Sequence, residues 1–128
     1  MEYYISKKTG FKFNEAVSKV TESLKNEGFG VLTEINIHDK FKEKLNVDFR
    51  KYKILGACNP AFALKALLAE DKIGTMLPCN VIIQEISKGI VEVAAVDPMA
   101  SMMAIENGSL VEIAAEVKEK LTRVIDSL

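Results

Sequence analysis

The chain has two cysteines, and each is followed by asparagine and lies close to a proline. They occur in Cys58-Asn59-Pro60 and in Pro78-Cys79-Asn80. A cysteine thiolate is a nucleophile and a ligand for soft metals, and a helix N-terminus favours the thiolate form. Because Asn59 and Pro60 are a typical helix start, we expect Cys58 at such a terminus and treat it as a candidate reactive thiol. The alternative is that Cys58 is a small buried residue at the end of a strand.

Three further polar residues extend this candidate site. Asn80 follows the second cysteine, Glu85 is an acidic residue in an otherwise apolar run, and Asp97-Pro98 repeats the pattern of a helix cap followed by proline. Helices that begin after Asn59 and Asp97 would offer backbone amides to an anionic group. For Glu85, a solvent-facing position without a ligand is the alternative. The candidate ligand-binding residues are Cys58, Asn59, Pro60, Cys79, Asn80, Glu85 and Asp97.

The sequence assigns no reaction, cofactor or metal. It has no Walker loop, no dinucleotide-binding glycine motif, no metal-spaced histidine pair and no nucleophile elbow. The separation of the cysteines excludes a Cys-x-x-Cys redox pair, and two thiols are too few for a closed zinc site. Met99, Met102 and Met103 would suit monovalent copper together with a thiolate, but methionines among alanines also fill gaps in a core. We therefore predict no bound metal and leave catalysis open.

Hydrophobic spacing predicts the elements that must position these residues. Apolar residues recur every three or four positions in two stretches, which we expect to be amphipathic helices. The second of these contains Ser109 and Glu112, which are spaced as a capping box. Alternating or continuous apolar runs predict five strands, and shorter helices lie between them. The two long helices are expected over 14–28 and 109–128, and the strands over 3–8, 31–38, 52–58, 80–86 and 90–96.

This order of elements predicts an α+β fold, specifically a two-layer α/β sandwich. Because helices separate most strands and one tight hairpin joins the last two, we expect a mixed sheet of about five strands. Two long helices suffice to cover one face of such a sheet, so the helices are expected on one face. The other face is then solvated or paired with a second copy, and the second possibility predicts a homodimer.

Length, composition and charge narrow the class of protein further. The chain has 128 residues without a low-complexity segment or linker, which predicts one domain over residues 1–128. Its 17 basic and 18 acidic side chains give a net charge of -1, so we expect no nucleic-acid partner. The N-terminus lacks a leader pattern and no apolar run is long enough to span a membrane, so we expect a cytoplasmic protein without a membrane partner.

One run of motifs resembles a known family. The residues that carry the resemblance are 52–60, Ala63, Ala66-Leu67, Gly74, 77–81 and 96–99, and they include both Cys-Asn pairs and Asp97-Pro98. In these positions the chain is similar to the microbial family called domain of unknown function 302 (DUF302). The resemblance implies a small two-layer α/β fold, commonly a dimer, and it implies no reaction.

Three functions from different classes remain open. The first is a homodimeric module that binds a small molecule or an anion where the Cys58, Cys79 and Asp97 corners meet. The second is thiol-based redox chemistry or soft-metal binding by Cys58 and Cys79. The third is a structural or interaction protein in which the same motifs only cap helices and form turns. The first requires that three corners far apart in the chain come together in one pocket.

Overall fold

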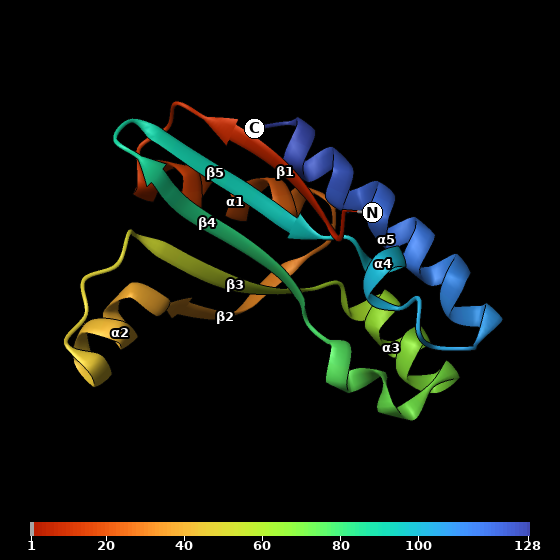
Figure 1. Cartoon of the computed structure of the whole chain (residues 1–128). Coiled ribbons are helices and arrows are strands. Elements are labelled where there is room, and N and C mark those ends of the chain that lie inside the picture. Colours follow the sequence, from red (N-terminus) through yellow and green to blue (C-terminus); the bar gives the residue numbers. More distant parts are fainter. Residues whose placement is uncertain (1) are drawn as a thin grey trace.

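The computed structural model describes residues 2–128, in which five strands form one sheet and helices lie beside it and beyond its ends (Figure 1). The strands are β1 (Tyr4–Thr9), β2 (Gly30–Asn36), β3 (Tyr52–Cys58), β4 (Cys79–Ser87) and β5 (Ile90–Val96). The helices are α1 (Phe13–Asn26), α2 (Ile37–Leu45), α3 (Pro60–Ala69), the 3₁₀ helix η1 (Asp71–Met76), α4 (Pro98–Ser101) and α5 (Gly108–Asp126). The predicted α+β fold is confirmed.

The sheet is antiparallel throughout, so the prediction of a mixed sheet is wrong. The strand order is β1-β5-β4-β3-β2, and all four neighbouring pairs run antiparallel. The prediction assumed that a helix between two strands crosses a face of the sheet. Instead, α2 lies beyond one end of β2 and β3, whereas α3 and η1 lie beyond the other end of the sheet (Figure 1). The chain therefore reverses direction at each of these helices and pairs with the strand it has just left.

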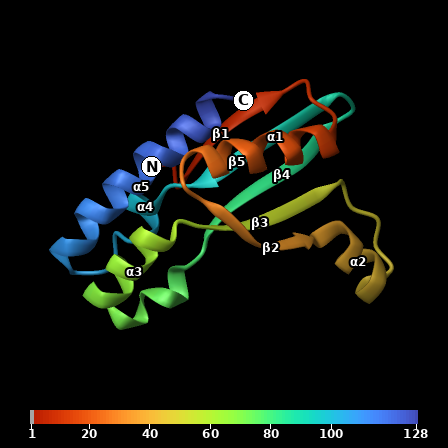
Figure 2. The same ribbon diagram turned by 180° about the vertical axis from the view of Figure 1, so that it is seen from behind.

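The two long helices cover one face of the sheet, as predicted. Seen from behind, α1 lies in front of β4 and β5 with α5 beside it (Figure 2). The apolar stripe of α1 has Ala16, Val20 and Leu24 completely buried, at the spacing of one helical face. These side chains meet Val81, Ile83, Val93 and other inward residues of the sheet in one core. Burying a leucine such as Leu24 contributes about 2 kcal/mol, so this face holds the two layers together.

Two element boundaries differ from the predictions. The second strand ends at Asn36, and His38 lies in the first turn of α2 instead of on a strand. Its Nδ1 accepts a hydrogen bond from the Tyr52 backbone N–H at 2.9 Å, which ties α2 to β3. The last helix begins at Gly108, because the Asn107 side chain accepts from the Ser109 N–H at 3.1 Å and takes the cap position. The predicted capping box at Ser109 is therefore wrong.

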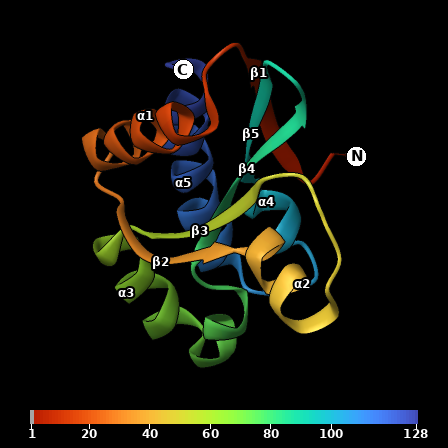
Figure 3. The same cartoon turned by 90° about the vertical axis from the view of Figure 1, so that its left-hand side faces the viewer.

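Within the described residues 2–128, no helix packs along the second face of the sheet. In the side view, α1 and α5 lie together on the same side of β1, β5 and β4 (Figure 3). Strand register places Ile54, Ile82 and Ala94 in one row across the opposite face. The next row along the strands holds Gln84 and Glu92.

Among residues 2–128, no helix has an apolar run long enough to span a bilayer.

Candidate functional site

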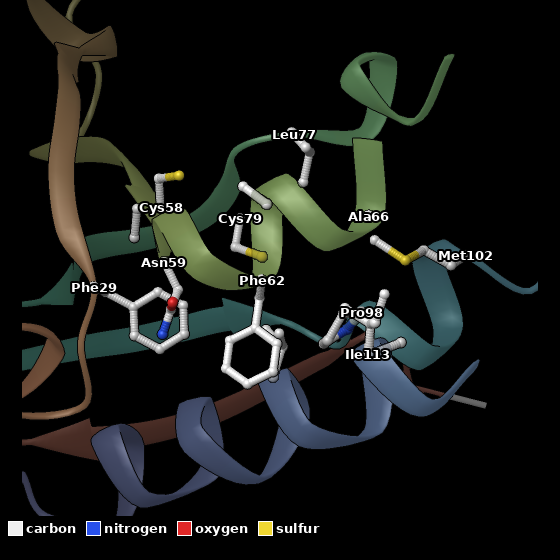
Figure 4. A pocket seen from close by; sticks show the side chains of 14 residues that line it. Phe29, Cys58, Asn59, Phe62, Ala66, Leu77, Cys79, Pro98, Met102 and Ile113 are labelled. Atoms are coloured by element: carbon white, nitrogen blue, oxygen red, sulfur yellow. The ribbon is translucent and has the colours of Figure 1, made fainter. Parts of the chain in front are cut away.

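A small apolar pocket lies under α3, at the end of the sheet where β3 ends and β4 begins (Figure 4). Its walls are formed by α3 on one side and α5 on the other, with the start of α4 closing one end. The pocket has a volume of about 30 Å³, which is room for one or two water molecules. The lining side chains come from Phe29, Ala57, Cys58, Asn59, Phe62, Ala63, Ala66, Leu77, Cys79, Pro98, Met102, Ile113, Ala114 and Val117.

Strand pairing brings the two cysteine motifs to this pocket. In the antiparallel pair of β3 and β4, Ala57 is directly opposite Cys79. The last residue of β3, Cys58, therefore lies at the same end of the sheet as the first residue of β4. The turn between β5 and α4 adds Pro98 from a third part of the chain. Three distant corners thus meet at one pocket, although only part of each predicted motif reaches it.

The thiol of Cys79 is held in its protonated form by its surroundings. Burial, followed by the neighbouring Cys58, raises the pKa of Cys79 to about 11. Neither cysteine is in a disulfide. The sulfur atoms of Cys58, Cys79 and Met102 lie at separate places along the pocket and do not point to a common centre (Figure 4). Thiolate chemistry at Cys79 near neutral pH is therefore disfavoured, since the thiolate is the reactive form.

Asn59 and Pro60 begin α3, as their sequence predicts, but the asparagine does not use its side chain as a cap. Its Nδ2 instead donates to the Glu27 carbonyl oxygen at 3.4 Å and lies close to Gly28. Asn59 thereby fastens the start of α3 to the end of α1. Pro60 is exposed at the first helical position and does not line the pocket.

Two of the predicted site residues lie away from the pocket. Asn80 is exposed on the open face of the sheet, because successive side chains of a strand point to opposite faces and Cys79 points inward. Glu85 lies near the other end of β4, where its backbone N–H donates to the Lys51 carbonyl oxygen at 3.0 Å. The sequence places both residues in the correct strand, but side-chain alternation and strand length separate them from the cysteines.

Asp97 lies next to the pocket residue Pro98 and caps the N-terminus of α4. It is 8% exposed, and its Oδ1 accepts from the Met99 backbone N–H at 2.9 Å, which caps α4. Its Oδ2 lies 2.9 Å from Lys118 Nζ of α5. The anion expected at this helix terminus is therefore replaced by the carboxylate of Asp97 itself. The residue joins the β5–α4 corner to α5 and so supports the pocket wall.

We expect Asp97→Ala to lower the free energy of unfolding by about 2 kcal/mol, because it removes both the cap and the partner of Lys118. Asp97→Asn keeps an acceptor for the Met99 N–H and should cost about half as much. Urea denaturation measures both. Asp48→Ala is the matched control, since Asp48 pairs with Lys42 at a side-chain exposure of 91% and should change stability by less than about 0.5 kcal/mol. Equal stability of Asp97→Ala and Asp48→Ala would contradict this role.

Sequence reasoning missed most of the apolar lining of the pocket. Phe29, Phe62 and Ile113 are aliphatic or aromatic residues outside every motif, so only their three-dimensional position distinguishes them from other core residues. One signal was present in the sequence. The α3 segment PAFALKALLA is apolar on all sides, as in helices that are covered on every face, although this helix lies at the surface.

The methionines do not gather as a soft-metal site. Met102 lines the pocket, whereas Met99 and Met103 are exposed outside it. Within residues 2–128, no group of three His, Cys, Asp or Glu side chains is arranged to hold a metal ion.

Comparison with known proteins places the chain in a family. The family model described as domain of unknown function DUF302 matches residues 5–128. The chain belongs to the DUF302 family. This DUF302 chain is also similar to a solved structure, the crystal structure of an uncharacterized conserved DUF302 protein from Bacillus stearothermophilus. The two are 29% identical over 98% of each chain, with a TM-score of 0.91. No curated protein matches. The resemblance predicted from the sequence is confirmed, and the family is uncharacterised.

Proposed function

We propose that this DUF302 protein is a homodimeric module that binds a small apolar molecule in the pocket beneath α3. The observation that carries the proposal is the meeting of Cys58, Cys79 and Pro98, from three distant corners, around an apolar space that the side chains leave unfilled. The lining is almost wholly apolar, and leaving apolar surface without contacts costs stability, so the presence of this pocket favours a use for the space.

The apolar character of the ligand follows from the lining. Among the lining residues, Asn59 has the only amide side chain, and its Nδ2 already donates to the Glu27 carbonyl oxygen. The buried thiol of Cys79 stays protonated and neutral, because its pKa is raised to about 11. A charged ligand would lose its hydration here without gaining partners, whereas an apolar one would gain contacts.

Entry of a ligand requires movement of α3 and η1. Pockets for small ligands usually measure about 300 Å³ or more, so the present volume of 30 Å³ would have to widen before a ligand could bind. The main packing partners of α3 are α5 and η1. A small buried cluster of Ala66, Ile73 and Leu110 packs the unit formed by α3 and η1 against α5. The unit is joined to the sheet at Asn59 and at Leu77, so these two connections would serve as its hinges.

Binding of benzene tests the proposal directly. In ¹⁵N NMR titrations we expect saturable shifts at Cys58, Phe62 and Cys79 in the wild-type protein. Ala66→Leu adds three carbons to a wall residue that is 2% exposed, and should weaken benzene binding at least about tenfold. Ala115→Leu adds the same three carbons at an exposed position of α5 outside the pocket and should bind like wild type. Absence of saturable shifts in the wild type would leave the motifs with structural roles only.

The proposed dimer interface is the outer face of α3. Three leucines of this one short helix are exposed to water: Leu64 by 60%, Leu67 by 42% and Leu68 by 80%. Such a cluster of exposed apolar side chains is typical of an interaction surface. A second copy packed on this face would cover these leucines and stabilise the closed position of α3. We further propose a cytoplasmic location, in line with two cysteines that are both unpaired.

Sedimentation equilibrium tests the dimer. We expect a mass of twice 14.2 kDa for the wild-type protein and 14.2 kDa for Leu68→Glu, because a carboxylate buried at the interface has no partner. Ser18→Glu adds the same charge on the exposed side of α1 and should remain dimeric. A wild-type monomer at all concentrations, or an unchanged mass for Leu68→Glu, would contradict this interface.

A further inference from the structure

The open face of the sheet carries a second hollow, separate from the pocket beneath α3. It measures about 390 Å³, within the range of small-ligand sites. Its floor is apolar, with Ile82 and Ala94 side by side on β4 and β5. Polar and aromatic side chains surround this floor, among them Tyr4, Tyr52, Asn80, Gln84 and Glu92.

Gln84 and Glu92 line one end of the hollow, and Arg50, which lies just outside the lining, joins them in a hydrogen-bonded row. Arg50 Nε donates to Gln84 Oε1 at 2.8 Å, and Gln84 Nε2 donates to Glu92 Oε1 at 2.9 Å. The Arg50 guanidinium also lies over the rings of Phe49 and Tyr52, at 4.3 and 5.8 Å from their centres. The row and the aromatic rings therefore fix the position of a guanidinium before any ligand binds.

The row keeps two opposite charges close together but unpaired. Within residues 2–128, neither Arg50 nor Glu92 forms an ion pair within 4.0 Å. The amide of Gln84 separates them, and Lys8 is opposite Glu92 on β1 without reaching it. Arg50 uses one of its five N–H donors in the row, and Glu92 uses one of its two oxygens. Donors and acceptors of opposite charge thus remain available on either side of Gln84.

We infer that this hollow binds a free α-amino acid with an apolar side chain. The ammonium nitrogen and a carboxylate oxygen of an α-amino acid are about 3 Å apart, similar to the separation of the oxygen and nitrogen of the Gln84 amide, which accepts from Arg50 and donates to Glu92 in the same sense. The carboxylate would accept from the free guanidinium nitrogens of Arg50, and the ammonium would donate to Glu92. The apolar side chain would then lie on Ile82 and Ala94, two residues further along the same strands.

Calorimetric titration with L-leucine tests this inference on the full chain. We expect saturable binding of L-leucine and at least about tenfold weaker binding of 4-methylpentanoate and of 3-methylbutylamine, each of which lacks one charge. Arg50→Gln and Glu92→Gln should each weaken leucine binding at least about tenfold. Arg123→Gln and Glu112→Gln are the matched controls, since both residues lie on α5, and they should bind leucine like wild type.

Four results would overturn the inference. One is the absence of saturable leucine binding up to about 10 mM. The second is equal affinity for leucine and for either analogue, and the third is equal weakening by Arg50→Gln and Arg123→Gln. The fourth is dissociation of a wild-type dimer by Arg50→Gln in sedimentation, because a second copy and not an amino acid would then cover this face. NMR spectra of each variant confirm that it is folded.

Discussion

In a Cys58→Ala variant, the remaining thiol of Cys79 should react with iodoacetamide at pH 7.5 at least about a hundredfold more slowly than free cysteine. The pKa of Cys79 is raised to about 11 in the wild-type protein, and burial, the larger of its two causes, persists when Cys58 is replaced, whereas a free cysteine has a pKa of about 8.5. Only the thiolate is alkylated, so the smaller thiolate fraction sets the rate. Because the buried thiol also loses solvent access, the factor from ionisation alone is a lower limit.

The pH profile separates ionisation from access. Since the pKa is raised, the rate at Cys79 should keep rising about tenfold per pH unit beyond pH 9, where the rate of free cysteine levels off. In guanidinium chloride the two rates should become equal. A native rate close to that of free cysteine would show that Cys79 is open to solvent and ionised, and would restore the thiol-based reading that burial disfavours.

Replacing Gly56 by alanine should lower the free energy of unfolding by about 3 kcal/mol. Gly56 lies in the buried part of β3, and a Cβ atom there would overlap the Thr33 side chain and approach Pro78 Cγ to 2.8 Å. The threonine can change its rotamer, but the proline ring is rigid. Pro78 directly precedes Cys79, so making room for the new methyl group would require the start of β4 to move. Urea denaturation detects this as a loss of stability.

Gly30→Ala is the matched control for this substitution. Gly30 is also in a strand, but a Cβ atom there would meet nothing within 4 Å, so stability should change by less than about 0.5 kcal/mol. Thr33→Ala combined with Gly56→Ala should recover part of the loss, because one of the two overlaps disappears. Equal effects of Gly56→Ala and Gly30→Ala would contradict the close packing of Pro78 on β3.

Much of the architecture follows from patterns within single elements. The stripe of Ala16, Val20 and Leu24 predicts α1 and its buried face, since helical spacing alone decides which side chains share a face. The Cys58 and Cys79 motifs predict the ends of β3 and β4 and, through them, one corner of the site. These features need no knowledge of how distant elements are arranged.

The features that sequence reasoning missed depend on strand register and order. Asn80 and Glu85 were predicted in the site because they share a strand with Cys79. Side-chain alternation puts Asn80 on the open face of the sheet, and the length of β4 puts Glu85 far from the cysteines. The mixed sheet was wrong because helix length does not say whether a helix crosses the sheet or lies beyond it. The row of Arg50, Gln84 and Glu92 comes from three segments that only the antiparallel register aligns.

The most direct test of the pocket beneath α3 is a crystal of the wild-type protein under xenon pressure. Xenon enters dry apolar cavities and scatters strongly, so its position can be seen without a known ligand. Our account predicts xenon density between Phe62, Cys79 and Ile113 in the wild type and none there in Ala66→Leu. Density for ordered water in this place, or a space closed by side chains, would contradict the proposal that the protein keeps an apolar ligand pocket.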